Sequence, residues 1–216
     1  MKKIIVLLVF IFLSVTVTAQ ISFGVRAGMD VSSYYSASSI YSFKPGVHVG
    51  AIVDFPISSK FSFVSGLYLA DKGTKVKGDF PPDNVYFFLP VEPYSFIETH
   101  NNYQLEIPLL FTYKIPLNSN LSLKPQIGAY FAYTLFGNIK DERVYYRGKQ
   151  TNSKNYSVSD GIYGVGANAG ISVLHNKFSF TYSCDFGILN HEDGYVFYEV
   201  GNYPDICMFL SLGYNF

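Results

Sequence analysis

Apolar residues occupy every second position along much of the chain beyond residue 20. In the segment ISFGVRAGMDVSS, residues 21–33, the odd positions from Ile21 to Val31 are apolar, and Ser, Gly, Arg and Asp stand between them. Strict alternation over about a dozen residues is the pattern of a β-strand with two different faces. The run is also longer than the roughly 5–6 residues of an average globular strand. This segment therefore predicts a long strand.

The same pattern recurs and predicts eight strands. They span residues 21–33, 46–55, 61–70, 102–114, 121–136, 162–174, 178–189 and 206–216. Short connections at 56–60, 115–120 and 175–177 alternate with long polar connections at 33–44, 72–101, 137–160 and 190–203. Short turns on one rim and long loops on the other are typical of transmembrane β-barrels. We therefore predict an all-β fold, an eight-stranded antiparallel up-and-down transmembrane β-barrel with short periplasmic turns and long outer loops.

Two prolines, Pro108 and Pro125, lie inside these predicted strands. Proline has no backbone N–H to donate within a sheet, and it is normally found at a sheet edge or at a bulge. Because a closed barrel has no edge strand, we expect a local β-bulge at each proline.

The polar face of the strands indicates which side of the barrel meets lipid. It mixes Gly and Ser with a few charges of both signs, whereas a water-facing surface carries more Lys and Glu. A narrow barrel interior is filled by side chains, and an unpaired charge there is costly. We therefore predict an interior polar network of opposite charges that contains Arg26, Asp30, Glu106 and Lys124. The alternative is a sandwich or lipocalin-like barrel in water, with its apolar face inward.

Composition narrows the class of protein. The 216 residues carry a formal net charge of +0, with 15% charged and 18% aromatic residues. A typical globular domain has about a quarter charged residues, so this chain is poor in charge and rich in residues that favour strands. Because there is no basic excess, we expect no nucleic-acid partner.

The first 19 residues have the pattern of a secretory signal peptide. Two lysines precede an apolar run, and Val17 and Ala19 occupy the −3 and −1 positions of a cleavage site. We therefore divide the chain into a signal peptide, residues 1–19, and an outer-membrane β-barrel domain, residues 20–216. The alternative for the first segment is an N-terminal anchor helix.

The C-terminal segment ICMFLSLGYNF alternates up to the final aromatic residue. Chain ends usually fray unless they are tied into the structure, so a strand that ends on Phe216 is expected to close the barrel. We predict that Tyr214 and Phe216 form the C-terminal assembly signal of an outer-membrane barrel. The barrel-assembly machinery would recognise this strand by β-augmentation during insertion.

These segments together resemble the PorT-like outer-membrane β-barrel domain family of Bacteroidetes-type bacteria. The resemblance covers nearly the whole mature chain and rests on FGVRAGMDVS, YQLEIPLLFTYK, KPQIGAYFAYTL and the terminal LSLGYNF, with LEIPLL as its most specific part. It implies an eight-stranded barrel in the outer membrane, and a link to protein secretion in some members. The seventh strand departs from the family, because YSCDFG lacks the Arg-Tyr pair that often precedes a Gly there.

Catalytic and ligand-binding motifs are few. The segment GVGANAG, from Gly164 to Gly170, lacks the GxGxxG spacing and the following helix of a dinucleotide loop. We interpret its glycines as inward positions that make room for bulky neighbours. The histidines, of which His48 is expected inside the barrel, show no metal-ligand spacing. We therefore expect no cofactor and no metal site.

Cys184 and Cys207 lie in the last two predicted strands. Cys184 shares the phase of the lipid-facing residues of its strand, whereas Cys207 is out of phase with the apolar residues of its own strand. Residues on opposite faces point their Cβ atoms apart, and a disulfide needs Cβ atoms about 3.5–4.5 Å apart. We predict two free thiols.

The sequence thus predicts a small, non-enzymatic outer-membrane barrel with a structural or interaction role that assists secretion or surface assembly. Its expected partners are outer-membrane lipid, the barrel-assembly machinery, and a surface or secretion partner that contacts the 72–101 loop. The alternatives are a narrow channel and an outer-membrane lipid-modifying enzyme, which needs a Ser–His pair near the outer leaflet. An eight-stranded barrel leaves little room beyond its own side chains, which disfavours conduction.

Overall fold

The structure is a computed structural model that describes residues 21–35, 40–79, 95–145, 148–191 and 205–216. The segment expected to be a signal peptide, residues 1–19, lies outside the described residues. Within the described part, the strands in chain order are β1 (Ser22–Tyr34), β2 (Tyr41–Ser42), β3 (Lys44–Pro56), β4 (Phe61–Asp79), β5 (Ser95–Tyr113), β6 (Ile115–Pro116), β7 (Leu121–Tyr145), β8 (Gly148–His175), β9 (Phe178–His191) and β10 (Asp205–Asn215). No helix long and apolar enough to cross a membrane occurs among these residues.

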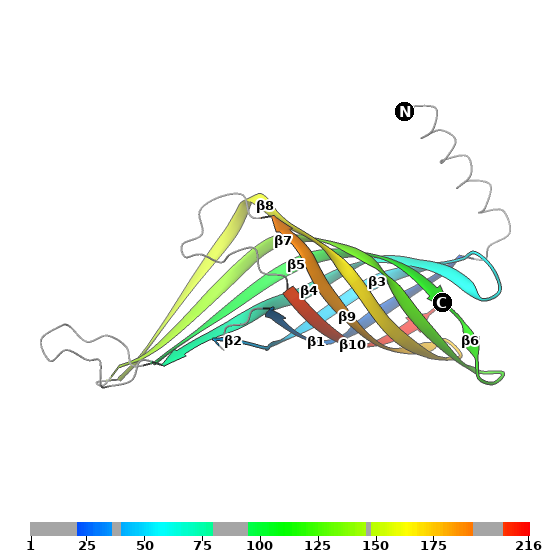
Figure 1. The fold of residues 1–216 in the computed structure, drawn as a ribbon, viewed down its shortest axis with the longest axis horizontal. Helices are drawn as coiled ribbons and strands as arrows, with labels where there is room; N and C mark the ends of the chain where they lie inside the picture. The colour runs from blue at the N-terminus through cyan, green and yellow to red at the C-terminus, as the bar shows by residue number, and fades with distance from the viewer. Residues whose placement is uncertain (1–20, 36–39, 80–94, 146–147, 192–204) are drawn as a thin grey trace, which may run out of the picture.

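All strands except the two-residue β2 and β6 form a closed ring. Their order is β4–β3–β1–β10–β9–β8–β7–β5, and β5 pairs with β4 to complete the circle. All of these pairings are antiparallel, and β1 joins β10 from Gly24↔Asn215 to Tyr34↔Asp205. Figure 1 shows the ring with the C-terminus and the short turns at one end. The predicted eight-stranded antiparallel barrel is therefore confirmed.

Short turns close that end because their residues satisfy the backbone locally. The Asn118 side chain accepts hydrogen bonds from the N–H groups of Asn120 and Leu121, at 3.0 and 2.7 Å. Asn176 adopts a φ of 54° in the turn between β8 and β9, a left-handed conformation that Asn tolerates. The backbone N–H of Phe216 also donates to the carbonyl oxygen of Phe23, at 2.9 Å, which ties the last residue to β1.

Four strands continue beyond the segments predicted for them. The β4–β5 pairing extends to Asp79↔Ser95 and the β7–β8 pairing to Tyr145↔Gly148. Residues 73–79, 95–101, 138–145 and 148–155 form a four-stranded extension, here called the outer sheet, which projects from the end opposite the short turns (Figure 1). The expectation of loops in these ranges is therefore wrong. The segments are mostly polar and show no sustained apolar alternation, yet backbone pairing with neighbouring strands needs no apolar face.

The prolines do not produce the predicted bulges. Pro108 pairs with Tyr130 and Pro125 pairs with Ile171, and the register shifts lie elsewhere, at Tyr103/Gln104, Thr134/Phe136 and Val165/Gly166. On its β4 side, β5 lacks a ladder pair at Pro108, but the register is the same before and after the gap. Pro125 falls between the β5 pairing, which ends at Gln126, and the β6 pairing, which begins at Leu123. Each missing N–H is therefore accommodated by a gap in one ladder.

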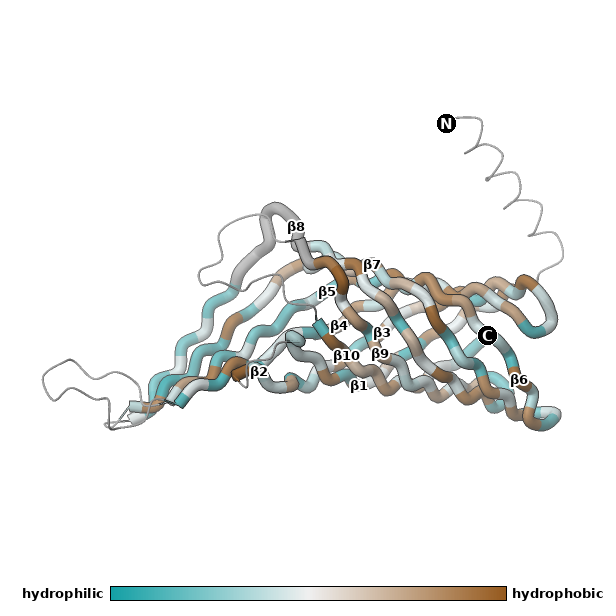
Figure 2. The backbone as a smooth tube through the Cα atoms, viewed as in Figure 1, coloured by the Kyte–Doolittle hydropathy of each residue, from teal (hydrophilic) through white to brown (hydrophobic). Residues whose placement is uncertain are grey.

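The apolar face points outward, as predicted. Met29, Ile127 and Leu212 are 69%, 67% and 68% exposed, whereas the interior is lined by buried Ser, Thr and charged residues. Figure 2 shows apolar positions alternating along the barrel and a more polar outer sheet. A barrel in water would bury these apolar side chains, so the lipocalin-like alternative does not fit the structure.

Candidate functional site

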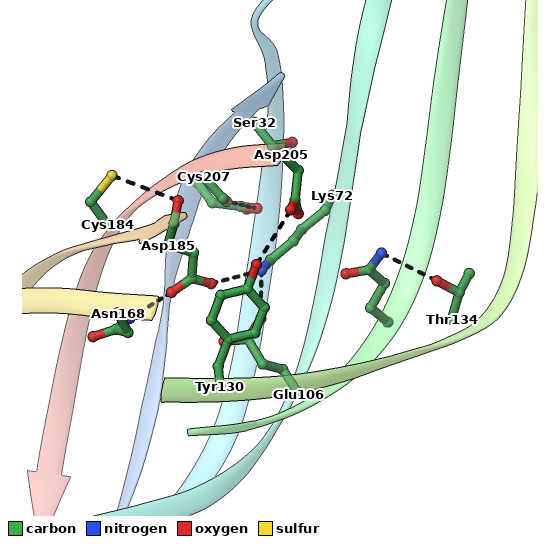
Figure 3. A network of polar contacts seen from close by, with 12 residues as sticks. Ser32, Lys72, Glu106, Tyr130, Thr134, Asn168, Cys184, Asp185, Asp205 and Cys207 are labelled. Carbon is green, nitrogen blue, oxygen red and sulfur yellow. Dashed lines mark hydrogen bonds and ion pairs between the residues drawn. The ribbon is translucent and has the colours of Figure 1, made fainter. Parts of the chain in front are cut away.

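The centre of the barrel holds one lysine between two carboxylates. Lys72 Nζ lies 2.5 Å from Glu106 Oε2 and 2.7 Å from Asp185 Oδ2, and all three side chains are almost completely buried. Asn168 donates a further hydrogen bond to Asp185 Oδ1 at 2.6 Å. These residues come from β4, β5, β8 and β9, and Figure 3 shows them converging in the lumen. We call Lys72, Glu106, Asn168 and Asp185 the central cluster.

Two aromatic rings pack against the lysine of the central cluster. Its Nζ lies 4.7 Å from the ring centroid of Tyr130 and 5.0 Å from that of Phe209, distances at which a ring face attracts a cation. The Tyr130 hydroxyl donates to Asp205 Oδ1 at 3.3 Å. A Cβ on Gly166 would lie 2.4 Å from the Tyr130 ring, so the glycine makes the room that the sequence interpretation assigned to it.

A small cavity lies in the lumen beside the central cluster. It has a volume of about 30 Å³, and its lining includes Arg26, His48, Tyr68 and Glu106. A cavity of this size holds about one or two water molecules. The lumen is therefore filled at this level, and the ion pairs and rings of the central cluster occupy the space that a permeating solute would need.

His48 and Ser211 form a Ser–His contact of the kind that a lipid-modifying enzyme requires. The contact lies inside the barrel and not at its rim. His48 Nε2 lies 2.8 Å from Ser211 Oγ, and both side chains are buried. The other ring nitrogen, Nδ1, has no hydrogen-bond partner among the described residues. A nucleophilic Ser–His pair needs an acid to orient the imidazole, and the described residues supply none here.

The upper lumen, next to the outer sheet, contains a second set of buried charges. Lys44 Nζ lies 2.6 Å from Asp71 Oδ1, and Cys207 Sγ lies 3.8 Å from Asp30 Oδ2. Asp30 is 2% exposed, and its Oδ1 has no hydrogen-bond partner among the described residues. Cys184 lies on the outward face beside Met208, and both cysteines are free, as predicted.

The lower lumen, near the short turns, has its own pairs. Lys124 Nζ forms an ion pair with Asp54 Oδ2. Two hydroxyl pairs lie in the same half: Ser62 with Thr112 at 2.8 Å, and Ser172 with Thr181 at 2.7 Å. The interior is therefore layered, with separate polar contacts at successive heights.

No ion pair joins any two of the four residues predicted to form one network. Asp30, Glu106 and Lys124 are buried in the lumen, but Glu106 pairs with Lys72 and Lys124 pairs with Asp54. Arg26 lines the small cavity and makes no ion pair with a described carboxylate. Arg26 and Glu106 line the same cavity, whereas Lys124 lies nearer the short turns, and their membership of one network stays a prediction. Sequence reasoning missed Lys72, which continues the inward phase of Tyr68 and Ala70 into the segment taken as a loop.

Aromatic side chains mark both rims of the lipid-facing band. Tyr103 stacks on Phe136 with ring centroids 4.7 Å apart, where the outer sheet begins. At the opposite rim, Tyr214 packs against Phe178 and Phe216 at 5.3 and 5.6 Å. Such belts lie at the membrane–water interfaces. The position of Tyr214 and Phe216 at the rim with the short turns keeps them available for the assembly role expected of them.

Comparison with solved structures finds several proteins that match over most of their length at low sequence identity. The attachment invasion locus protein Ail of Yersinia pestis is 12% identical, with a TM-score of 0.43, over 90% of this chain and 98% of that chain. Neisserial surface protein A is 13% identical, with a TM-score of 0.40, over 90% and 97% of the two chains. OprG from Pseudomonas aeruginosa is 10% identical, with a TM-score of 0.39, over 90% and 95%. No curated protein matches the sequence.

The sequence also matches a family model, and the match spans residues 16–192, well over half of the chain. The model describes an outer membrane protein β-barrel domain. The closed ring of eight long strands, the outward apolar face and the two aromatic belts are the features that such a domain requires. The protein is located in the outer membrane, and the chain belongs to the outer membrane protein β-barrel domain family.

Proposed function

We propose that the protein is a membrane-anchored interaction barrel that presents its outer sheet to a protein partner in secretion or surface assembly. The observation that carries this proposal is the contrast between the two halves of the molecule. The lumen is crossed by the central cluster, whereas four strands continue past the lipid-facing band as a polar sheet. A barrel that only spanned the membrane would not need this extension.

The outer sheet is suited to contact a protein. Its strands are fixed by continuous backbone pairing, so the surface is ordered before a partner arrives. Ion pairs support the face that continues the lumen, where Arg143 Nε lies 2.7 Å from Asp141 Oδ2. Ordered surfaces bind with a smaller entropic cost than loops that fold on binding. The segment 80–94 of the expected partner loop lies outside the described residues.

A deletion tests the proposal. Asn138 and Asn155 face each other in the β7–β8 ladder, so residues 139–154 can be replaced by an Asn-Gly turn, which suits a two-residue hairpin. We expect the variant to insert and remain heat-modifiable on gels but to lose the partner that cross-links to the full-length protein in native outer membrane. The control replaces residues 117–120 of a short turn with a Gly/Ser sequence of equal length and keeps the partner. Equal cross-linking by both variants would contradict the proposal.

The same preparations test the channel alternative. In planar bilayers the full-length protein should give no stepwise conductance, because the central cluster fills the lumen. Two results together would favour a channel instead. The protein would conduct until its lumen is narrowed, and it would cross-link to no other protein.

A further inference from the structure

We infer that the outward face of the outer sheet holds a binding site for the phosphate groups of outer-leaflet glycolipid, formed by Lys75, Lys77 and Lys140. These three residues are called the basic patch. The site lies on the face that continues the lipid-facing side of the barrel. It does not depend on the proposed partner protein.

The register places the lysines together. Lys75 pairs with Thr99, and Thr99 pairs with Lys140 on the next strand. Adjacent strands are about 4.8 Å apart, so the two lysine Cα atoms are roughly 10 Å apart. Lys77 lies two residues beyond Lys75 on the same face, about 7 Å further along the strand. Three ammonium groups on flexible stems can therefore converge on one phosphorylated group.

The charge of the basic patch is only partly compensated. Lys75 and Lys77 make no ion pair with a described carboxylate, and Lys140 shares Glu142 with Lys149. Two other acids are in phase with these lysines on β4: Asp79, which is exposed at the far end of the strand, and Asp71, which is paired with Lys44. Lys77 and Lys140 are also exposed. The outward face thus keeps a net positive charge next to the membrane surface.

The residues of the outward face change in an order that matches the layers of a membrane surface. The aromatic stack of Tyr103 and Phe136 comes first, at the level where such rings meet headgroups. The next outward row contains Asn101 and Asn138, and the row after that contains the first lysines of the patch. The aromatic rings therefore face the boundary of the hydrocarbon core. The amides beyond them face the sugars of the glycolipid, and the ammonium groups face its phosphates.

The height of the basic patch fits this assignment. Lys75 is four residues beyond Asp71, which lies in the same ladder row as Tyr103. Four residues of a strand tilted by about 40° rise roughly 10 Å. Headgroups occupy about 5–8 Å on each side of the hydrocarbon core, and a lysine stem can reach back over the difference. The outer-leaflet glycolipid of the protein's own membrane is the anionic surface at that height.

Triple substitution tests the site. Full-length mature wild-type protein, K75Q/K77Q/K140Q and the control K60Q/K114Q/K154Q are compared for retention of diphosphorylated lipid A by native mass spectrometry. The control removes three exposed lysines from the short-turn end and from the opposite face of the outer sheet. Each lysine near an anionic surface is worth about a fivefold change in affinity, so loss of the patch should weaken retention about a hundredfold. The control should stay within about threefold of wild type.

Two further measurements test whether phosphate is the group that is bound and whether the variants are folded. Dephosphorylated lipid A should bind wild type and K75Q/K77Q/K140Q equally, because the difference comes from phosphate. Heat-modifiability of all three proteins verifies that the substitutions at exposed positions leave the barrel folded. Equal loss of lipid in the two triple variants overturns the inference, and so does displacement of the lipid by millimolar inorganic phosphate, which would indicate a site for free anions.

Discussion

Lys72 Nζ lies 2.7 Å from Asp185 Oδ2, so a side chain of β4 meets a side chain of β9 across the lumen although the two strands are not neighbours in the ring. With Glu106 on β5, the neighbour of β4, the lysine links one side of the barrel wall to β9 on the other. Removing charges from water is costly, and mutual pairing offsets that cost only while all partners are present. The central cluster therefore behaves as a unit.

Substitution of Lys72 by Met should destabilise the barrel strongly. Met is similar in length but leaves two carboxylates buried without their cation, which costs about 3–5 kcal/mol in the free energy of unfolding. Denaturant unfolding in lipid nanodiscs measures this loss. The matched variant Lys77→Met, at an exposed position of the same strand, should change stability by less than about 0.5 kcal/mol.

The triple variant K72M/E106Q/D185N distinguishes a broken ion pair from lost packing. The triple variant buries no ionised carboxylate without its cation, so it should recover part of the loss. A triple variant as unstable as Lys72→Met would show that the loss does not come from the two carboxylates left without their cation.

Strand phase could be predicted from the sequence, whereas the partners of the polar residues could not. Alternation correctly placed Asp30 and Glu106 on the inward face, because the period of two assigns each position to one side. Which residues meet depends on the stagger between strands, and Lys124 meets Asp54 from seventy positions away in the chain. The outer sheet was missed for a different reason: its segments are mostly polar and lack a sustained apolar alternation, so only their pairing reveals them.

Gly166 should resist substitution because a Cβ there would lie 2.3 Å from the backbone carbonyl oxygen of Phe186 and 2.4 Å from the Tyr130 ring. We expect Gly166→Val to reduce the free energy of unfolding by about 1–3 kcal/mol through overpacking. Combined with Tyr130→Ala, the loss should be less than the sum of the two single losses. Ala169→Val, at an exposed outward position of the same strand, serves as the control and should be nearly neutral. Simple additivity would mean that Gly166 and Tyr130 do not compete for space.

The two cysteines should differ in reactivity in the folded barrel. Cys207 is 0% exposed, whereas Cys184 lies on the outward face and is partly exposed. A lipid-soluble maleimide should label the C207S variant in micelles at least about tenfold faster than the C184S variant, because labelling requires access to the thiol. Unfolded, non-reduced wild-type protein should yield two reactive thiols. A yield of none would reveal a disulfide and refute the phase assignment.

Glu142 of the outer sheet should remain ionised in unusually acidic solution. Its Oε1 lies 2.8 Å from Lys140 Nζ and its Oε2 lies 2.6 Å from Lys149 Nζ. Hydrogen bonds from Lys140 and Lys149 lower the pKa of Glu142 from 4.5 to about 2. A carboxylate with a lowered pKa adds stability above its unfolded pKa, and this contribution is lost as the pH falls from about 4.5 through about 2. Carboxyl ¹³C NMR of glutamate-labelled protein, with Glu142→Gln for assignment, follows this titration.

If Lys140 and Lys149 lower the pKa of Glu142, two further results are expected. In the K140Q/K149Q variant its carboxyl should titrate close to 4.5, because the donors that lower its pKa are gone. In wild type, about 1 M salt should raise the midpoint, since the screening length falls to about 3 Å and the group lies at the surface. A wild-type midpoint near 4.5 at low salt would contradict the Lys140–Glu142–Lys149 arrangement. In that case Lys140 would not be paired with Glu142, and the net positive charge of the basic patch would be larger.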